Sequence, residues 1–187
     1  MKHDSKIYRL LLDVINDHDQ EWTSQEIRWF ETMPSLKEPI RTAAESKRED
    51  GTCHPHQRRL FSRPKAIPTA TRRLLAAEPK INECSSFEEL HELIVNLLAD
   101  VFGIGPLYCY DVAVRIGAYL HKLPEKVHLH AGPLNGAKLL GLSTDRGVLE
   151  VSELPEPLQG FEPFEIEDIL CHFANAAKHT RQKARIC

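Results

Sequence analysis

The sequence predicts an all-α fold, a compact multi-helix domain of about seven to nine helices around a central helix-hairpin-helix. Two observations support this class. Apolar residues recur at helical spacing in several segments, and the two strongest segments are separated only by the turn Gly103-Ile104-Gly105. The one run that could be extended, 148–151, is too short to make a sheet.

Three helices are expected in the N-terminal part of the chain. The second begins at a capping box of Thr23 and Glu26, and the third is capped by Ser35. The first covers 4–19, where apolar residues repeat every three or four positions: Ile7, Leu10, Leu11, Val14 and Ile15.

The middle of the chain is irregular. Three prolines interrupt residues 51–68, and no periodicity persists there, so this stretch is interpreted as a loop or arm. A short helix is expected at 69–77, closed by Pro79.

The strongest helical pattern lies in the second half of the chain. A second capping box, Ser86 with Glu89, starts one helix, and Pro106 opens the next. Further helices are expected at 133–140 and 163–179. The apolar stripe of the first of these helices comprises Phe87, Leu90, Ile94, Leu97, Leu98 and Val101.

The expected organisation is N-terminal helices at 1–50, a basic loop or arm at 51–80, and the helix-hairpin-helix core with the C-terminal helix at 81–187. Together these parts are expected to form one compact domain, since 187 residues suffice for a hydrophobic core. The residues expected in that core are Ile7, Leu11, Phe87, Leu90, Ile94, Leu98, Val112, Ile116, Ile169 and Phe173.

The net charge of −3 is distributed unevenly. Residues 41–73 carry nine cations and three anions, whereas 81–100 carry five carboxylates and 147–168 carry seven, with no Lys or Arg in either. This distribution excludes a wholly basic nucleic-acid binder. It leaves two interpretations, one basic face on an acidic body or a solvated arm whose arginines pair with the acidic segments. The cations concerned are Arg58, Arg59, Arg63, Lys65, Arg72 and Arg73.

The cysteines and the N-terminus indicate a cytoplasmic protein. Five cysteines at irregular spacing form no CxxC pair, which favours reduced thiols. The first twenty residues contain too many charges for a signal peptide, and no stretch approaches membrane-spanning length. We therefore expect no membrane contact.

The turn before Pro106 is a candidate phosphate site. Gly103 and Gly105 allow close approach of another backbone, and the first-turn N–H groups of the following helix favour an anion. The expected phosphate-binding residues are Gly103, Ile104, Gly105, Arg58, Arg59 and Arg115. The expected partner is duplex DNA, contacted without sequence preference.

Three segments resemble the helix-hairpin-helix DNA glycosylase superfamily over about residues 86–142. These are FGIG at 102–105, VHLH at 127–130 and LGL at 140–142, which follow the family's order of hairpin, Val-Asp-x-His stretch and Leu-Gly. The resemblance implies DNA contact by the hairpin and base-excision chemistry. The segments HPHQRR, GIGPLY and HAG also resemble those of a bacterial protein family that supplies no activity.

Several positions depart from the glycosylase pattern. His128 occupies the position of the family's catalytic Asp, and the position of its lyase lysine falls on Leu107 or Tyr108. Pro106 removes one N–H donor from the phosphate site, and the iron–sulfur cysteine pattern of part of the family is missing.

Histidines and cysteines supply the remaining candidates. Cys53, His54 and His56 could bind zinc with help from His128, His130, Cys171 or His172, but their spacing is poor, so no metal and no cofactor is expected. His128 and His130 would point the same way in an extended segment and could form an acid/base pair. The weak catalytic candidates are therefore His128, His130 and Asp111.

The sequence thus favours a non-sequence-specific DNA-binding protein without catalysis. One alternative is a base-excision-type DNA glycosylase or lyase with altered catalytic residues. Another is an oligomeric scaffold or interaction protein. These three hypotheses predict different behaviour toward DNA, and the sequence alone does not separate them.

Overall fold

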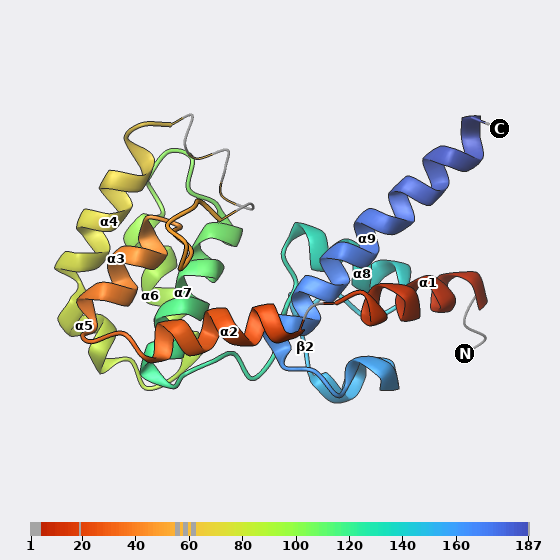
Figure 1. The fold of residues 1–187 in the computed structure, drawn as a ribbon, viewed down its shortest axis with the longest axis horizontal. Helices are drawn as coiled ribbons and strands as arrows, with labels where there is room; N and C mark the ends of the chain where they lie inside the picture. The colour runs from red at the N-terminus through yellow and green to blue at the C-terminus, as the bar shows by residue number, and fades with distance from the viewer. Residues whose placement is uncertain (1–4, 19, 55–56, 58–59, 61–62, 187) are drawn as a thin grey trace. The chain divides into compact units, whose positions relative to one another are not determined.

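The computed structural model describes residues 5–18, 20–54, 57, 60 and 63–186. Helices make up 65% of it, and its described residues contain nine α-helices and one two-stranded sheet (Figure 1). The prediction of an all-α fold is confirmed. None of the helices in these residues is long and apolar enough to cross a membrane.

The chain packs as two compact units. The first unit is formed by the described parts of 1–20 and 125–187, and the second unit by 21–124. The boundaries of these units do not coincide with the expected division at residues 50 and 80. The physical reason is that the N-terminal helix packs against the C-terminal helix, which joins the two ends of the chain in one unit.

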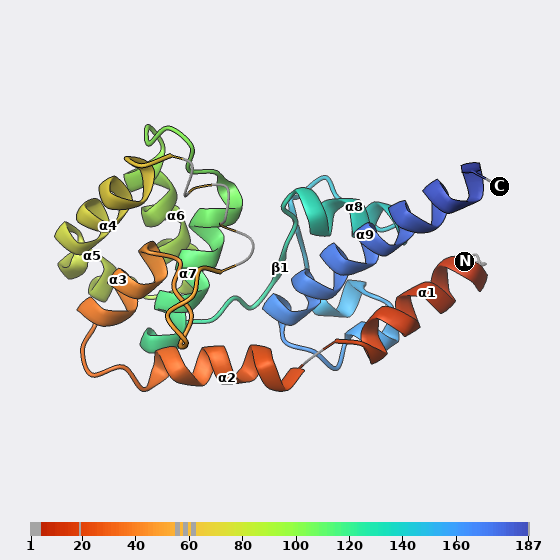
Figure 2. The same ribbon diagram turned by 45° about the horizontal axis from the view of Figure 1, so that its top comes forward.

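The described residues of the second unit form six helices. In Figures 1 and 2, α6 lies beside α7, and α7 also packs against α3. The helix α4 packs against both α3 and α6. The six helices are α2 (Gln20–Glu31), α3 (Lys37–Ala44), α4 (Ala66–Ala76), α5 (Glu78–Glu83), α6 (Phe87–Leu98) and α7 (Pro106–Leu120).

The central helix of the second unit is α7, which is buried on nearly every side between Tyr108 and Ala118. Small residues allow neighbours to approach it closely. A Cβ at Gly117 would contact the backbone of Lys122, where the chain turns back after the helix. The helix α7 is therefore the buried centre of this unit.

Several helix boundaries correct the expectations. The helix α2 already begins at Gln20, so Thr23 lies inside it, and α3 begins after Leu36 with no side-chain cap from Ser35. The helix α4 begins at Ala66, and Pro79 lies in the first turn of an additional helix, α5. A proline suits the first turn of a helix as well as it ends one, which explains the error.

The start of α6 agrees with the sequence. Ser86 accepts a hydrogen bond from the N–H of Glu89 at 3.2 Å, as the capping motif predicts. The Glu89 carboxylate, however, accepts from the N–H of Ser85 at 2.7 Å and from its hydroxyl at 2.8 Å. These bonds lower the pKa of Glu89.

The first unit contains three helices and the small sheet. Strands β1 (Val127–His128) and β2 (Val148–Leu149) pair antiparallel, so the expectation that the extended run makes no sheet is wrong. The helices are α1 (Ser5–Asn16), α8 (Ala131–Leu139) and α9 (Pro163–Ile186), and short 3-10 turns lie at Val151–Glu153 and Glu156–Leu158.

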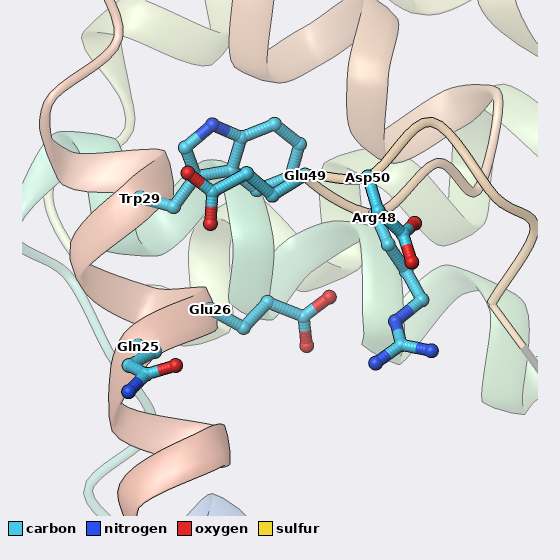
Figure 3. A pocket seen from close by; sticks show the side chains of 6 residues that line it. All are labelled: Gln25, Glu26, Trp29, Arg48, Glu49 and Asp50. Atoms are coloured by element: carbon cyan, nitrogen blue, oxygen red, sulfur yellow. The ribbon is translucent and has the colours of Figure 1, made fainter.

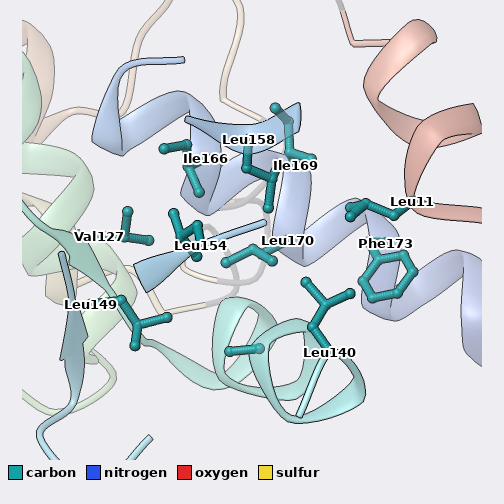
Figure 4. Close-up of a cluster of buried hydrophobic side chains, with 11 residues drawn as sticks. Leu11, Val127, Leu140, Leu149, Leu154, Leu158, Ile166, Ile169, Leu170 and Phe173 are labelled. Carbon is teal, nitrogen blue, oxygen red and sulfur yellow. The ribbon is translucent and has the colours of Figure 1, made fainter. Parts of the chain in front are cut away.

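The core of the first unit lies between α1, α8 and α9. Figure 4 shows Leu11 of α1 close to Phe173 of α9, with Leu140 beside them. All the predicted core residues of the chain are buried except Ile7, which is half-buried and packs against this cluster. The periodicity of the helices therefore identified their apolar faces.

Candidate functional site

The loop at 99–105 connects α6 to α7 and gives α7 an open start. Gly103 has φ +99°, and Gly105 is extended at the N-cap position with no side-chain cap. Pro106 follows as the first residue of α7 and contributes no N–H, so the first-turn donors come from the residues after it. The positive end of the α7 dipole lies at this uncapped turn.

Arg63 lies across this loop. Its guanidinium carbon is 4.8 Å from the centre of the Phe102 ring, a cation–π arrangement. A Cβ at Gly103 would come within 2.5 Å of the Arg63 side chain. The positive φ of Gly103 favours glycine at this position, whereas the flexible end of the Arg63 side chain could move aside for a Cβ.

Arg73 ties α4 to the end of α6. Its guanidinium donates to the carbonyl of Leu97 at 2.9 Å and to the Asp100 carboxylate, with one of these latter contacts at 3.0 Å. The Arg73 hydrogen bond lowers the pKa of Asp100. This ion pair links the last turn of α4 to the start of the loop at 99–105.

These elements enclose a shallow pocket of about 520 Å³. We call it, together with the turn at 103–105, the loop surface. Three cations and one carboxylate line it, so it carries a net positive charge, and Phe102 is 85% exposed beside them. The pocket is lined by Arg63, Pro64, Lys65, Ala66, Thr69, Arg73, Asp100, Val101 and Phe102.

The structure brings together only part of the predicted phosphate site. Gly103, Ile104 and Gly105 form the turn that belongs to the loop surface. Arg58 and Arg59 lie outside the described residues. Arg115 is only 4% exposed, and its Nε donates to Glu26 over 3.4 Å.

Three residues of the loop surface were missed as site residues by sequence reasoning. Arg63 and Lys65 appeared only as part of a basic stretch, and Phe102 only as a letter of the FGIG motif. A bulky aromatic residue directly before a glycine turn was the available signal, because such a residue has few neighbours to bury it. Its partner Arg63, 39 positions earlier in the sequence, gave no local signal.

The weak catalytic candidates lie in different units. Asp111 is on α7 of the second unit, where its carboxylate accepts a hydrogen bond from Gln57 Nε2 at 2.6 Å. His128 and His130 belong to the first unit, and their rings stack at 6.3 Å between centroids. His130 Nε2 is 3.7 Å from a carboxylate oxygen of Glu167. Each candidate is thus engaged by residues of its own unit.

The cysteines and histidines form no metal cluster among the described residues, and His56 lies outside them. His54 is buried, and its backbone N–H donates to the backbone carbonyl of Ser46 at 2.8 Å. Cys84 and Cys109 are buried thiols, as expected for small apolar residues. Burial raises the pKa of Cys109 to about 11.

A second pocket, of about 340 Å³, lies between α2 and the 48–50 segment (Figure 3). Figure 3 shows the Glu26 side chain of α2 directed toward Arg48 across this space. Carboxylates outnumber cations among its lining residues, so it repels anions. Its lining residues are Gln25, Glu26, Trp29, Arg48, Glu49 and Asp50.

No family model, no curated protein and no solved structure matches the chain. The loop surface is therefore interpreted from its own geometry and charge. It combines exposed cations, an open helix start and an exposed aromatic ring, which together suit a polyanion that carries flat apolar groups.

Proposed function

We propose that the chain binds duplex DNA through the loop surface, without sequence preference and without catalysing a reaction. The observation that carries this proposal is the presence of Arg63 and Lys65 in one pocket wall beside the glycine turn that opens α7. Cations and an open helix N-terminus are the groups that hold phosphate oxygens.

The glycine turn provides room for a phosphate. No atom of the described residues lies within 4 Å of the position that a Cβ would take on Gly105, so these residues leave the backbone there open to an approaching group. The dipole of α7, a helix of 15 residues, favours negative charge at this end. Pro106 removes one N–H donor from the start of α7, where the phosphate is proposed to bind. The side-chain cations therefore make the larger contribution to phosphate binding.

The charges available to DNA are few. Arg73 is already paired with Asp100, so it contributes less to the surface potential than its formal charge suggests. Arg63 and Lys65 are exposed. No amide side chain is found among the described residues that line the pocket, and Asn and Gln are common readers of adenine. The surface therefore fits contact with the DNA backbone.

Two substitutions at Gly105 test the phosphate seat. Gly105→Glu places a carboxylate at the start of α7, whereas Gly105→Gln adds a side chain of nearly the same size without the charge. We expect the Glu variant to bind duplex DNA about tenfold more weakly than the Gln variant, equivalent to ~1.4 kcal/mol. Fluorescence anisotropy with a labelled duplex at low salt measures both.

Lys80→Ala is the control for general loss of charge, because Lys80 is an exposed cation on α5 outside the pocket. Lys65→Ala should weaken binding more than Lys80→Ala does. If the wild-type protein fails to retard duplex DNA at low salt and micromolar concentration, the proposal is wrong and an interaction protein becomes the leading hypothesis.

A further inference from the structure

Phe102 is the most exposed large apolar side chain of the described chain, at 85%. We propose that its ring stacks on an unpaired nucleobase, so that the loop surface prefers DNA in which some bases are already unstacked. This inference rests on the proposed function, because it names the form of DNA that the same surface selects.

Arg63 covers one face of the Phe102 ring and leaves the other face for a nucleobase. Arg63 lies over one face at 4.8 Å, and Gly103 leaves the space that Arg63 occupies. The guanidinium limits the rotation of the ring, which lowers the entropy lost when a base stacks on the other face. A cation on the far face of an aromatic ring also adds to the attraction for nucleic acid.

Phe102 and the start of α7 are close enough in sequence to contact the same DNA strand. Phe102 precedes the N-cap residue Gly105 by three positions, and Phe102 lines the pocket that holds Lys65. A base on the ring and a phosphate at the start of α7 can therefore belong to neighbouring nucleotides. Base–aromatic stacking along a positively charged surface is the arrangement of sequence-tolerant single-strand binding.

Energetics decide which DNA this arrangement favours. In an intact duplex every base is already stacked, and exposing one costs a few kcal/mol. A gap of unpaired nucleotides has already lost that pairing, so the stacking gain is realised in full. Base–aromatic stacking corresponds to about five- to 150-fold in affinity, which sets the largest preference expected for gapped DNA.

The test compares three DNAs of equal length, an intact duplex, the same duplex with a short gap of unpaired bases, and the same gap made of abasic nucleotides. Affinity is measured by anisotropy for the wild type, Phe102→Ala and Phe102→Trp. Leu107→Ala is the matched control, because Leu107 is an exposed apolar residue next to the same turn without a ring. Circular dichroism checks that each variant stays helical.

We expect the wild type to prefer the base-containing gap by at least fivefold and to treat the abasic gap like the intact duplex. Phe102→Ala should lose the preference for the base-containing gap, whereas Phe102→Trp and Leu107→Ala should keep it. Equal affinity of the wild type for gapped and intact DNA would overturn this inference and leave the proposed function standing. Failure to bind any of the three DNAs would overturn the proposed function itself.

Discussion

Arg115 of α7 donates through Nε to a carboxylate oxygen of Glu26 on α2, over 3.4 Å, inside the second unit. The two side chains are only 5% and 15% exposed. The Nη1 atom of Arg115 is buried and has no hydrogen-bond partner in the described part of the chain. Glu26 is therefore the carboxylate that balances the positive charge of the buried Arg115 guanidinium.

Glu26→Gln should lower the free energy of unfolding by ~3 kcal/mol, because it leaves a buried guanidinium without a counter-charge. This is the lower end of the range for buried pairs, since Glu26 keeps some exposure at the pocket. Urea denaturation measures the change. Replacing both partners, with Glu26→Gln and Arg115→Met, should recover more than half of the loss.

Glu49→Gln is the control for the ion pair, because Glu49 lines the same pocket and is exposed. It should change stability by less than about 0.5 kcal/mol. If Glu26→Gln proved as mild as Glu49→Gln, the ion pair would contribute nothing beyond a surface contact.

Gly136 holds α8 against α9 in the first unit. A Cβ there would come within 2.9 Å of the Leu170 carbonyl carbon and still closer to its oxygen. Gly136→Ala gains about 1 kcal/mol of helix propensity but forces two backbones apart, which typically costs about 1 to 3 kcal/mol. Because the obstacle is backbone rather than a flexible side chain, we expect net destabilisation and a lower melting temperature.

Gly160→Ala provides the matched comparison in the same unit. Within the described part of the chain, nothing lies within 4 Å of a Cβ at Gly160, and its φ is not positive. This variant should melt at or slightly above the wild-type temperature, since alanine reduces the freedom of the unfolded chain. Equal melting of the two variants would show that α8 can move away from α9 at no cost.

His91 of α6 makes stability depend on pH. Its ring stacks on Phe87 at 5.8 Å, and burial lowers its pKa below the ordinary 6.5, opposed by the nearby Glu88. The unfolded chain therefore takes up the proton first as pH falls. The stability that neutral His91 contributes is present above about pH 6.5 and is lost as pH falls from there toward the folded-state pKa.

His91→Phe keeps a ring in this position and removes the titration. The free energy of unfolding, measured between pH 7.5 and pH 5 at about half-unit steps, should fall less steeply for this variant than for the wild type. Identical slopes would mean that His91 has the same proton affinity in the folded and unfolded chains.

The parts of the fold that follow from local pattern were predicted from the sequence. The stripe of Phe87, Leu90 and Ile94 identified the buried face of α6, and Ser86 identified its start. Both signals lie within a few residues of the structure they specify. Short-range spacing therefore sufficed for most helices and for the core.

Features that depend on distant partners were not predicted. Arg115 was expected to bind phosphate, but its partner in the structure is Glu26, which lies 89 positions earlier. Strand β1 pairs with β2 about twenty residues away, and two-residue strands are too short for periodicity to detect. The contact of Arg63 with Phe102 is likewise tertiary.

The salt dependence of DNA binding should separate the charged part of the loop surface from the stacking part. Few cations are available there, so we expect about two to five phosphate contacts and a slope of log K against log salt of about −2 to −5. Lys65→Ala removes one contact and should make the slope less steep by about one unit, whereas Phe102→Ala should leave it unchanged because stacking releases no counterions. Anisotropy titrations of an intact duplex between about 25 and 200 mM salt give both slopes. A Phe102→Ala slope that flattened as much as that of Lys65→Ala would show that the ring acts by holding Arg63 against phosphate, and the stacking role would have to be abandoned.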